Sequence, residues 1–447
     1  MNVPRASCSA TRGKYRHVEG NAGSPRSRWR PGKSPRRSTS SRWRWGRPPD
    51  RRGRAAGAGA GAREAAAVTR GRAGVVTVPG SPTLSGLRRA GLAQTQWKTW
   101  FPFSIPHGWA FSGRGALYHG VTRLCLPKGS TILVPAYHEG VEIDALLAAG
   151  CRVRHYRVDQ DLRVDLEDVV RLLDSRVAAL YVIHYFGLPQ PLPALRGFCD
   201  VHGIRLIEDC ALALFSRGHG TWLGSVGDLS IFSLYKTLPL PHGGYLVSPH
   251  QSSELRAPPA MSTLVQTLDL VHTTLQANGL SGVERVATRA SGLVKRVLGW
   301  QRQSTVSSGG SRWDPRLVDY GVSRWTRQLI GFTNREWVIA RRRANYQRLV
   351  LWLAPYAAIP FPELAPGVCP LLLPVLVPHR ERVQAQLQAL GVQSGNFWPN
   401  THATCPADLA AEVAPWRERC LELPIHQELE QEDVDRVATA VIEVLTK

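Results

Sequence analysis

Short apolar strands alternate with helices through the middle of the chain, and this alternation restricts the fold more than any other feature. Strands are predicted at 130–137, 151–159, 177–187, 204–209, 229–235 and 243–248. Helices are predicted at 113–126, 139–150, 165–175 and 192–203. Parallel strands need a crossover helix between them. The pattern therefore predicts an α/β fold whose central sheet is mostly parallel and covered by helices, with ligands bound beyond the carboxyl ends of the strands.

The pattern changes after residue 250. Helical spacing of apolar residues runs over 261–300, a loop is predicted at 304–314, and a long helix at 337–354. The last hundred residues mix a strand at 370–378 with helices at 381–391 and 432–447. We therefore predict a large α/β domain at 79–250, a helical connector at 251–335 and a smaller α+β domain at 336–447.

Residues 1–78 form a basic segment of low complexity. Residues 1–73 hold 19 Lys and Arg against 3 Asp and Glu, so they carry most of the net charge of +22. Their Arg, Gly, Ala, Pro and Ser cannot bury enough apolar surface to offset the entropy of ordering, which predicts disorder. Arg and Trp interleave at 41–47, a pattern that suits stacking on bases, but a charge block is usually a solvated tail. No folded DNA-reading motif is present, so we expect no nucleic-acid partner.

Nothing in the residue spacing indicates a membrane span or a metal site. No stretch of about 18 apolar residues occurs, so we expect no membrane span. Eight cysteines are scattered along the chain without a C-x-x-C pair or a Cys/His cluster of zinc spacing. This usage predicts reduced thiols, a cytoplasmic protein and no metal site.

The stretch "SIFSLYKTLPLPHGG" (230–244) carries the main chemical question. Ser233 and Lys236 match S-x-x-K, the nucleophile motif of some acyl enzymes, in which the serine begins a helix that carries the lysine. Here the motif ends an apolar strand, and two following prolines oppose a helix. The alternative is that Lys236 forms a Schiff base with a carbonyl cofactor, which requires a free amine and hence a site that lowers the pKa of the lysine. We favour this alternative.

Pyridoxal 5'-phosphate (PLP) would need two more groups. Asp209 stands where an apolar strand ends and is placed to pair with a protonated ring nitrogen, although an aspartate there also suits a turn or helix cap. The Gly-rich turn 112–117 opens a helix and suits a phosphate, or is an ordinary loop. Ser233 either adds a hydroxyl to the phosphate or fills the strand.

Several segments, in order, resemble the DegT/StrS aminotransferases, a PLP-dependent family of fold type I. The most extensive is "LIEDCALALFSRGHGTWLGSVGDLSIFSLYKTLPLPHGG" (206–244). The others are "SGRGALYHGVTRLCLPKGSTILVPAY" (112–137), "VIHYFGLP" (182–189), "RRRANYQRL" (341–349) and "LELPIHQELEQEDVDRV" (421–437). The resemblance covers about residues 110–250 and 335–445, and it implies the fold-type-I aminotransferase architecture.

The resemblance also implies residue roles. Lys236 would bind the cofactor covalently, and Asp209 would pair with the pyridine nitrogen. The phosphate would be held by Gly113, Arg114, Gly115 and Ser233. An aromatic ring would stack on the cofactor, and both Tyr137 and His138 are candidates. His184 would lie on the same rim, or be a structural histidine.

The chain departs from the family pattern in four places. Ser233 and Lys236 are three residues apart, where the family usually has five. Leu212 replaces a usual Gln or His, and His242 replaces a usual Glu. Residues 252–315 do not resemble the segment that approaches the nucleotide-sugar in sugar aminotransferases, so the cofactor is better supported than the substrate.

The resemblance implies an aminotransferase that moves an amino group from an amino-acid donor, glutamate or glutamine, to a keto-sugar-like acceptor. It also implies a homodimer whose subunits complete each other's active sites. Two alternatives remain. One is a PLP enzyme of the same fold with dehydratase-type chemistry, and the other is a non-catalytic PLP-binding regulator whose Arg-rich tail contacts nucleic acid.

Overall fold

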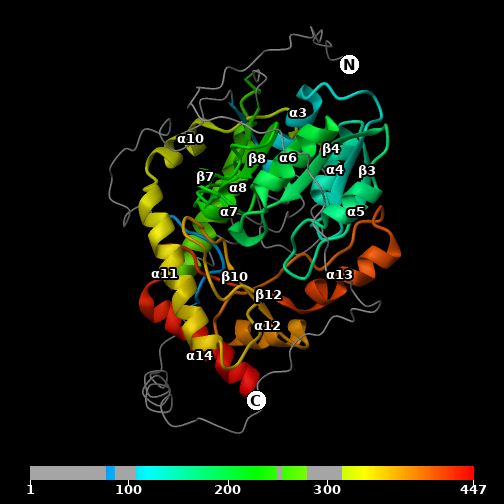
Figure 1. The fold of residues 1–447 in the computed structure, drawn as a ribbon. Helices are drawn as coiled ribbons and strands as arrows, with labels where there is room; N and C mark the ends of the chain where they lie inside the picture. Colours follow the sequence, from blue (N-terminus) through cyan, green and yellow to red (C-terminus); the bar gives the residue numbers. More distant parts are fainter. Residues whose placement is uncertain (1–76, 86–106, 249–253, 279–314) are drawn as a thin grey trace, which may run out of the picture. The chain divides into compact units, whose positions relative to one another are not determined.

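The computed structural model describes residues 77–85, 107–248, 254–278 and 315–447. Its main feature is a seven-stranded sheet in the order β1-β9-β8-β5-β4-β2-β3. The strands are β1 (His107–Ala110), β2 (Thr131–Pro135), β3 (Arg152–Tyr156), β4 (Val177–Ile183), β5 (Arg205–Asp209), β8 (Leu229–Ser233) and β9 (Gly244–Val247). Figure 1 shows this sheet in cyan and green with helices around it.

The direction of the strands confirms a mostly parallel sheet. The pairs β3–β2, β2–β4, β4–β5 and β5–β8 are parallel. Strand β9 is antiparallel to both β8 and β1. Every residue of β2, β8 and β9 is buried, as expected for strands whose two faces are both covered.

Four helices connect the parallel strands. They are α3 (Gly113–Arg123), α4 (Val141–Ala148), α5 (Leu166–Arg171) and α6 (Leu192–His202). Because crossovers between parallel strands are right-handed, the strand order puts α3 and α4 on one face and α5 and α6 on the other. Helix α3 packs against α4 and also against β8 and β9, which agrees with this arrangement. The α/β architecture predicted from the alternation is therefore confirmed.

Two local features differ from the sequence prediction. The strand predicted at 229–235 ends at Ser233, and Leu234–Thr237 form a single helical turn, α7. Pro239 and Pro241 come after this turn, so they do not oppose it. The objection to an acyl enzyme that rested on the absence of a helix after Ser233 is therefore wrong. Strand β1 was not predicted, because its four residues lack an apolar run and are held at the sheet edge by pairing with β9.

The C-terminal part carries a second, antiparallel sheet of three strands in the order β10-β12-β11. Its elements are α11 (Arg335–Leu353), β10 (Leu373–Leu376), α12 (Arg380–Ala389), β11 (Gly395–Asn396), α13 (Ala407–Arg419), β12 (Cys420–Leu423) and α14 (Gln431–Thr446). Helices α11 and α14 pack side by side (Figure 1). They enclose an apolar core with the sheet, and Val78 joins this core through a bridge to Val392.

The remaining described elements are short or lie between the two sheets in sequence. They are η2 (Tyr185–Gly187), β6 (Arg217–Gly218), β7 (Thr221–Trp222), α8 (Ala260–Ala277), η3 (Pro315–Leu317) and α10 (Arg324–Gly331). The predicted disorder of 1–73, the loop 304–314 and the helical pattern over 279–300 lie outside the described residues. The predicted domain boundaries stay predictions. Among the described helices, none combines the length and the apolar character that a bilayer crossing requires.

One buried arginine links the C-terminal part to the turn that carries Lys236. Arg342 of α11 is 1% exposed. Its Nη2 donates to the Thr237 carbonyl at 3.0 Å, its Nη1 to the Leu371 carbonyl at 2.8 Å, and its Nε to Gln427 at 2.8 Å. Burial lowers the pKa of Arg342 to about 10. The guanidinium therefore holds α7 against two other segments.

We predict that Arg342→Met destabilises the protein, because it leaves several buried acceptors without a donor. A hydrogen bond to a charged group contributes about 1.5–3 kcal/mol, so the free energy of unfolding should fall by about 3 kcal/mol or more. Denaturant titration followed by circular dichroism measures this change. Arg382 of α12 is exposed, so Arg382→Met is the control and should leave the midpoint unchanged. Equal midpoints for the two variants would contradict the role given to Arg342.

Candidate active site

The predicted cofactor residues come from neighbouring strands of the large sheet. Asp209 is the last residue of β5, and Ser233 is the last residue of β8, which pairs with β5. Lys236 follows in α7. Strand β2 ends at Pro135, and Glu139 follows it. The carboxyl ends of parallel strands share one edge of a sheet, where ligands of open α/β sheets bind.

Asp209 is held in a fixed orientation by two donors. The Tyr181 hydroxyl of β4 donates to Oδ2, and the backbone N–H of Ala211 donates to Oδ1 at 2.7 Å. Burial raises the pKa of the Asp209 carboxyl, against the lowering effects of these donors and of the Lys236 charge. A cation placed beside Asp209, such as a protonated ring nitrogen, would offset this desolvation.

Lys236 faces carboxylates. Its Nζ lies 3.9 Å from Oε2 of Glu139, and a quarter of its side chain is exposed. Burial lowers the pKa of Lys236, but the charges of Glu139, Asp209 and Glu142 help to raise it above its ordinary value overall. The expectation that the site lowers this pKa is therefore wrong, because the nearby charges are anionic. The Lys236 charge lowers the pKa of Asp209, and the Asp209 charge raises the pKa of Lys236.

Glu142 adds a second buried acid near Lys236. Its two carboxylate oxygens accept from the backbone N–H groups of Glu139 at 2.9 Å and Gly140 at 3.0 Å, at the start of α4. Burial and the Glu139 charge raise the pKa of Glu142 to about 8, although the N–H donors act against this. Glu142 thus shapes the turn that presents Glu139 to Lys236.

Gly113 and Ser233 meet at the N-terminus of α3. A Cβ at Gly113 would stand 3.3 Å from the Ser233 Cβ, so the backbone of the first helical turn touches β8. The Ser233 side chain is 3% exposed and its Oγ has no hydrogen-bond partner in the described part of the chain. An unpartnered buried hydroxyl beside a helix N-terminus suits an anion.

Gly115 and Gly244 have structural roles at the same place. The Gly115 N–H donates to Oγ of the N-cap residue Ser112 at 3.2 Å. A Cβ at Gly244 would stand 2.0 Å from the Ser112 carbonyl oxygen, so only glycine fits there. Arg114 lies half-buried between Gly113 and Gly115 on α3. The phosphate roles of Gly113, Arg114, Gly115 and Ser233 stay predictions.

Tyr137 and His138 point to other neighbours than Lys236. The Tyr137 ring packs in a buried aromatic cluster with Tyr185, Phe397, Trp398 and Trp416. The His138 ring lies 5.2 Å from that of His155. The next residue, Glu139, is the one whose carboxylate lies 3.9 Å from Nζ of Lys236. Which residue stacks on a cofactor therefore stays a prediction.

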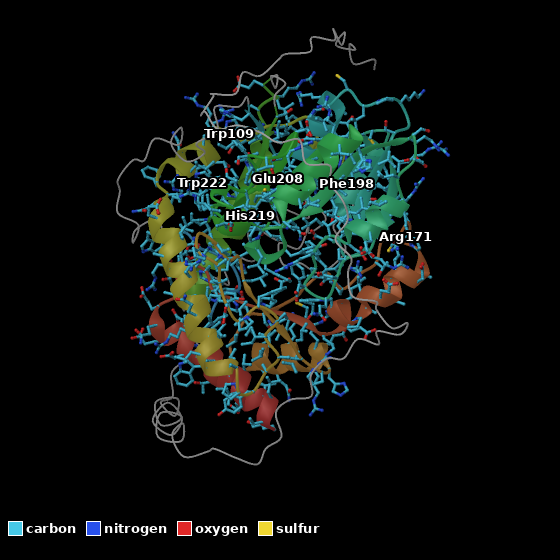
Figure 2. The ribbon with its side chains drawn as sticks, in the orientation of Figure 1. Trp109, Arg171, Phe198, Glu208, His219 and Trp222 are labelled. Atoms are coloured by element: carbon cyan, nitrogen blue, oxygen red, sulfur yellow. The ribbon has the colours of Figure 1, made fainter. Side chains whose placement is uncertain are left out.

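His184 has a structural set of contacts. Its Nδ1 accepts from the Gln190 N–H at 3.1 Å, so Nε2 donates to Glu208 at 3.0 Å. Glu208 lies among the strands of the central sheet (Figure 2). Its oxygens also accept from the N–H groups of Gly224 at 2.9 Å and Val226 at 2.8 Å. Both ring nitrogens of His184 are thus engaged with protein groups.

Three residues near Lys236 and Asp209 were not predicted. Glu139 and Glu142 give only a local signal, because acids are common at the start of a helix. Tyr181 is a polar residue in a buried apolar strand, and this could have indicated a partner for a neighbouring strand end. The unusual Leu212 is buried, and His242 bonds to Ser323 at 3.2 Å and Thr326 at 3.1 Å.

Comparison with known proteins decides the family. The model of the DegT/DnrJ/EryC1/StrS aminotransferase family matches residues 110–257 and 328–442. The chain belongs to this family. The first matched segment, 110–257, includes the strand ends that carry Asp209 and Lys236, and the family is one of PLP-dependent aminotransferases.

Individual relatives agree with this assignment. GDP-perosamine synthase of Vibrio cholerae is 31% identical over 140 residues, which are 31% of this chain and 38% of that protein. A dTDP-4-dehydro-2,3,6-trideoxy-D-glucose 4-aminotransferase of Saccharopolyspora spinosa is 28% identical over 352 residues, which are 73% of this chain and 81% of that one. The crystal structure of S. venezuelae DesV with a ketimine intermediate has a TM-score of 0.55 at 20% identity, and it covers 87% of this chain and 95% of its own. This likeness confirms the fold.

We predict that Glu139→Gln lowers the pKa of Lys236, because it removes a negative charge that stabilises the ammonium form. An opposite charge within 4–6 Å shifts a pKa by roughly one unit or more, so the labelling profile of Lys236 should move to lower pH by about one unit. Competitive acetylation across pH, with Lys236 quantified by peptide mass spectrometry, measures this shift.

Lys128 is exposed and serves as the internal reference in the same samples. The control variant is Glu254→Gln, which removes an exposed carboxylate paired with Arg327. If the labelling profile of Lys236 is the same in Glu139→Gln and in the unmodified chain, Glu139 does not affect the pKa of Lys236.

Proposed function

We propose that this chain is a PLP-dependent aminotransferase that moves an amino group from glutamate or glutamine to a keto-sugar. The observation that carries the proposal is that Asp209 ends β5 and that Lys236 lies in the turn directly after β8, the strand paired with β5. Family membership and relatives that act on nucleotide-linked sugars support the reaction and the substrate class.

The residues present fit the cofactor. Lys236 supplies an amine, Asp209 a fixed carboxylate, and Ser233 an orphaned buried hydroxyl beside the N-terminus of α3. The phosphate would be held by Ser233 and the first turn of α3, and the ring nitrogen by Asp209. When bound, PLP supplies an aldehyde that takes up the amino group and a protonated ring that accepts electrons from the substrate.

Lys236 would carry the proton transfers, and Glu139 would act on its charge. A lysine attacks a carbonyl only as the free amine, so Lys236 would first lose its proton to solvent, whereas the Glu139 carboxylate, 3.9 Å from Nζ, favours the ammonium form. Lys236 Nζ would then act as base and afterwards as acid at the reacting carbon of the substrate. Because Glu139 holds charge next to this amine, it also favours the return of the proton.

Asp209 keeps its orientation independent of the substrate. Tyr181 and the Ala211 N–H bind both of its oxygens from within the protein. A buried carboxylate held in this way does not rotate away from a cation beside it, so Asp209 would keep a protonated ring nitrogen of the cofactor charged. The assembly proposed from the family resemblance is a homodimer whose subunits complete each other's sites.

We predict that Lys236→Ala abolishes the visible absorbance of the protein mixed with PLP. It should also lower the transamination rate by about 10²–10⁴-fold, the usual contribution of a general acid–base group. Lys128→Ala changes an exposed lysine away from the site and should behave as the unmodified chain. The measurement is a spectrum before and after addition of glutamate, which converts the visible band in a transaminase and leaves it in a dehydratase-type enzyme. A chain that takes up no PLP would overturn the proposed function.

We also predict that Ser233→Ala weakens PLP binding about tenfold, because a charge-assisted hydrogen bond to the phosphate is lost. Ser230 of the same strand is the matched control. It is equally buried and its Oγ is also unpartnered among the described residues, but it lies on the opposite face of the strand. Equilibrium dialysis against PLP gives both dissociation constants. If Ser230→Ala and Ser233→Ala weaken binding equally, the phosphate lies elsewhere.

A further inference from the structure

Three side chains from distant parts of the sequence meet beside the end of β2. They are His138, which follows β2, His155 of β3, and Cys405 in the loop before α13. One nitrogen of each histidine and the Cys405 sulfur all lie within 4.8 Å of one another. Residue spacing did not indicate this cluster, because the fold alone brings the three segments together.

Three ring nitrogens of this cluster have no hydrogen-bond partner among the described residues. His138 is fully buried, and neither of its ring nitrogens has a hydrogen-bond partner within the described residues. His155 is 3% exposed, and its Nε2 is also unpartnered there. The Cys405 thiol has only a long contact, 4.0 Å, to the Ala136 carbonyl. Buried polar groups are nearly always satisfied, so such a group indicates a water or an ion.

The chemistry of the three side chains indicates which metal ion they would bind. Two imidazoles and a thiol match the nitrogen and sulfur ligands of Zn²⁺, whereas Mg²⁺ and Ca²⁺ require oxygen. Ligand atoms around a tetrahedral zinc stand roughly 3.5 Å apart. The two nitrogens and the sulfur lie within 4.8 Å of one another. A side-chain movement of about 1 Å would bring them to the spacing of zinc ligands.

We propose that His138, His155 and Cys405 form a zinc-type metal site that joins strands β2 and β3 to the loop before α13. The metal ion binds one nitrogen of each imidazole and the sulfur of Cys405, which releases its proton to solvent. A solvent molecule takes the fourth position. This site goes beyond the proposed aminotransferase function, because none of that chemistry requires a metal.

Arg417 is the main opposing charge. Its Nη1 donates to the carbonyls of His138 at 3.0 Å and Trp398 at 2.9 Å, and its Nη2 to that of Ala136 at 3.1 Å. The guanidinium thus spreads its charge over carbonyl oxygens around the cluster. A thiolate at Cys405 supplies one negative charge, which offsets part of the positive charge of the metal ion and this guanidinium.

His402 is placed to support the site. Its ring lies 6.3 Å from that of His138, and its nitrogens contact Asp144 at 3.2 Å and Thr404 at 2.8 Å. Because these contacts already engage the ring, we do not include His402 among the ligands. It anchors the loop that carries Cys405 to the start of α4.

The test uses the full chain, stripped with a chelator and titrated with Co²⁺ as a spectroscopic substitute for Zn²⁺. We expect one bound ion per chain, with visible bands of tetrahedral Co²⁺ and a near-ultraviolet band from sulfur ligation. Cys405→Ser should remove the sulfur band, and Cys405→Ser and His155→Asn should each weaken binding about 100-fold. Elemental analysis of the zinc-loaded chain gives the stoichiometry independently.

Cys151→Ser and His202→Gln are the matched controls, because they change a partly exposed free cysteine and an exposed histidine away from the cluster. Both should bind metal as the unmodified chain does. If the unmodified, folded chain binds no Co²⁺, or binds it without a sulfur band, the site does not exist and the cluster holds only water. Binding that survives both ligand substitutions would also overturn the proposal, and the spectrum of the unmodified chain decides the matter if a variant fails to fold.

Discussion

The hydrogen bonds of the Glu208 carboxylate hold together the part of the sheet on which the active site depends. From the middle of the sheet, this buried side chain accepts from His184 after β4 and from Gly224, Val226 and Gly227 in the loop before β8. Burial would raise the pKa of Glu208, but these donors lower it below its ordinary value. The carboxylate is therefore an anion, and its hydrogen-bond donors surround it. Since Asp209 is the next residue, the same bonds set where the end of β5 stands relative to β8.

The charges around Lys236 follow from this placement. The carboxylates of Glu139 and Asp209 favour the ammonium form of Lys236, and Oε2 of Glu139 lies 3.9 Å from its Nζ. Glu142 contributes less, because burial raises its pKa to about 8. The Asp209 carboxylate would likewise favour a protonated ring nitrogen placed beside it. Lys236 itself must lose its proton before it can attack a carbonyl.

Much of the architecture could be predicted from the sequence, and the limits have physical causes. Apolar runs that alternate with predicted helices indicate parallel strands. An acid at the end of such a strand, or a lysine just after it, is then expected at the edge of the sheet where ligands bind. The turn α7 was missed because one helical turn has too few residues to show a period. Glu139 was missed because pairing with Lys236 depends on how two strand ends converge, and nothing local in the sequence records this. His138, His155 and Cys405 were missed for the same reason.

Adjacent residues after β2 serve two different sites. The Glu139 side chain lies against Lys236, whereas the His138 ring lies against that of His155. A metal ion bound by His138 would exclude this ring from stacking on the cofactor, and the two sites would share a backbone. A metal held by His138 would restrict the segment that presents Glu139, and loss of the metal would loosen it. The Glu139 carboxylate beside Lys236 would thus be positioned in part by the metal ligand that precedes it in the chain.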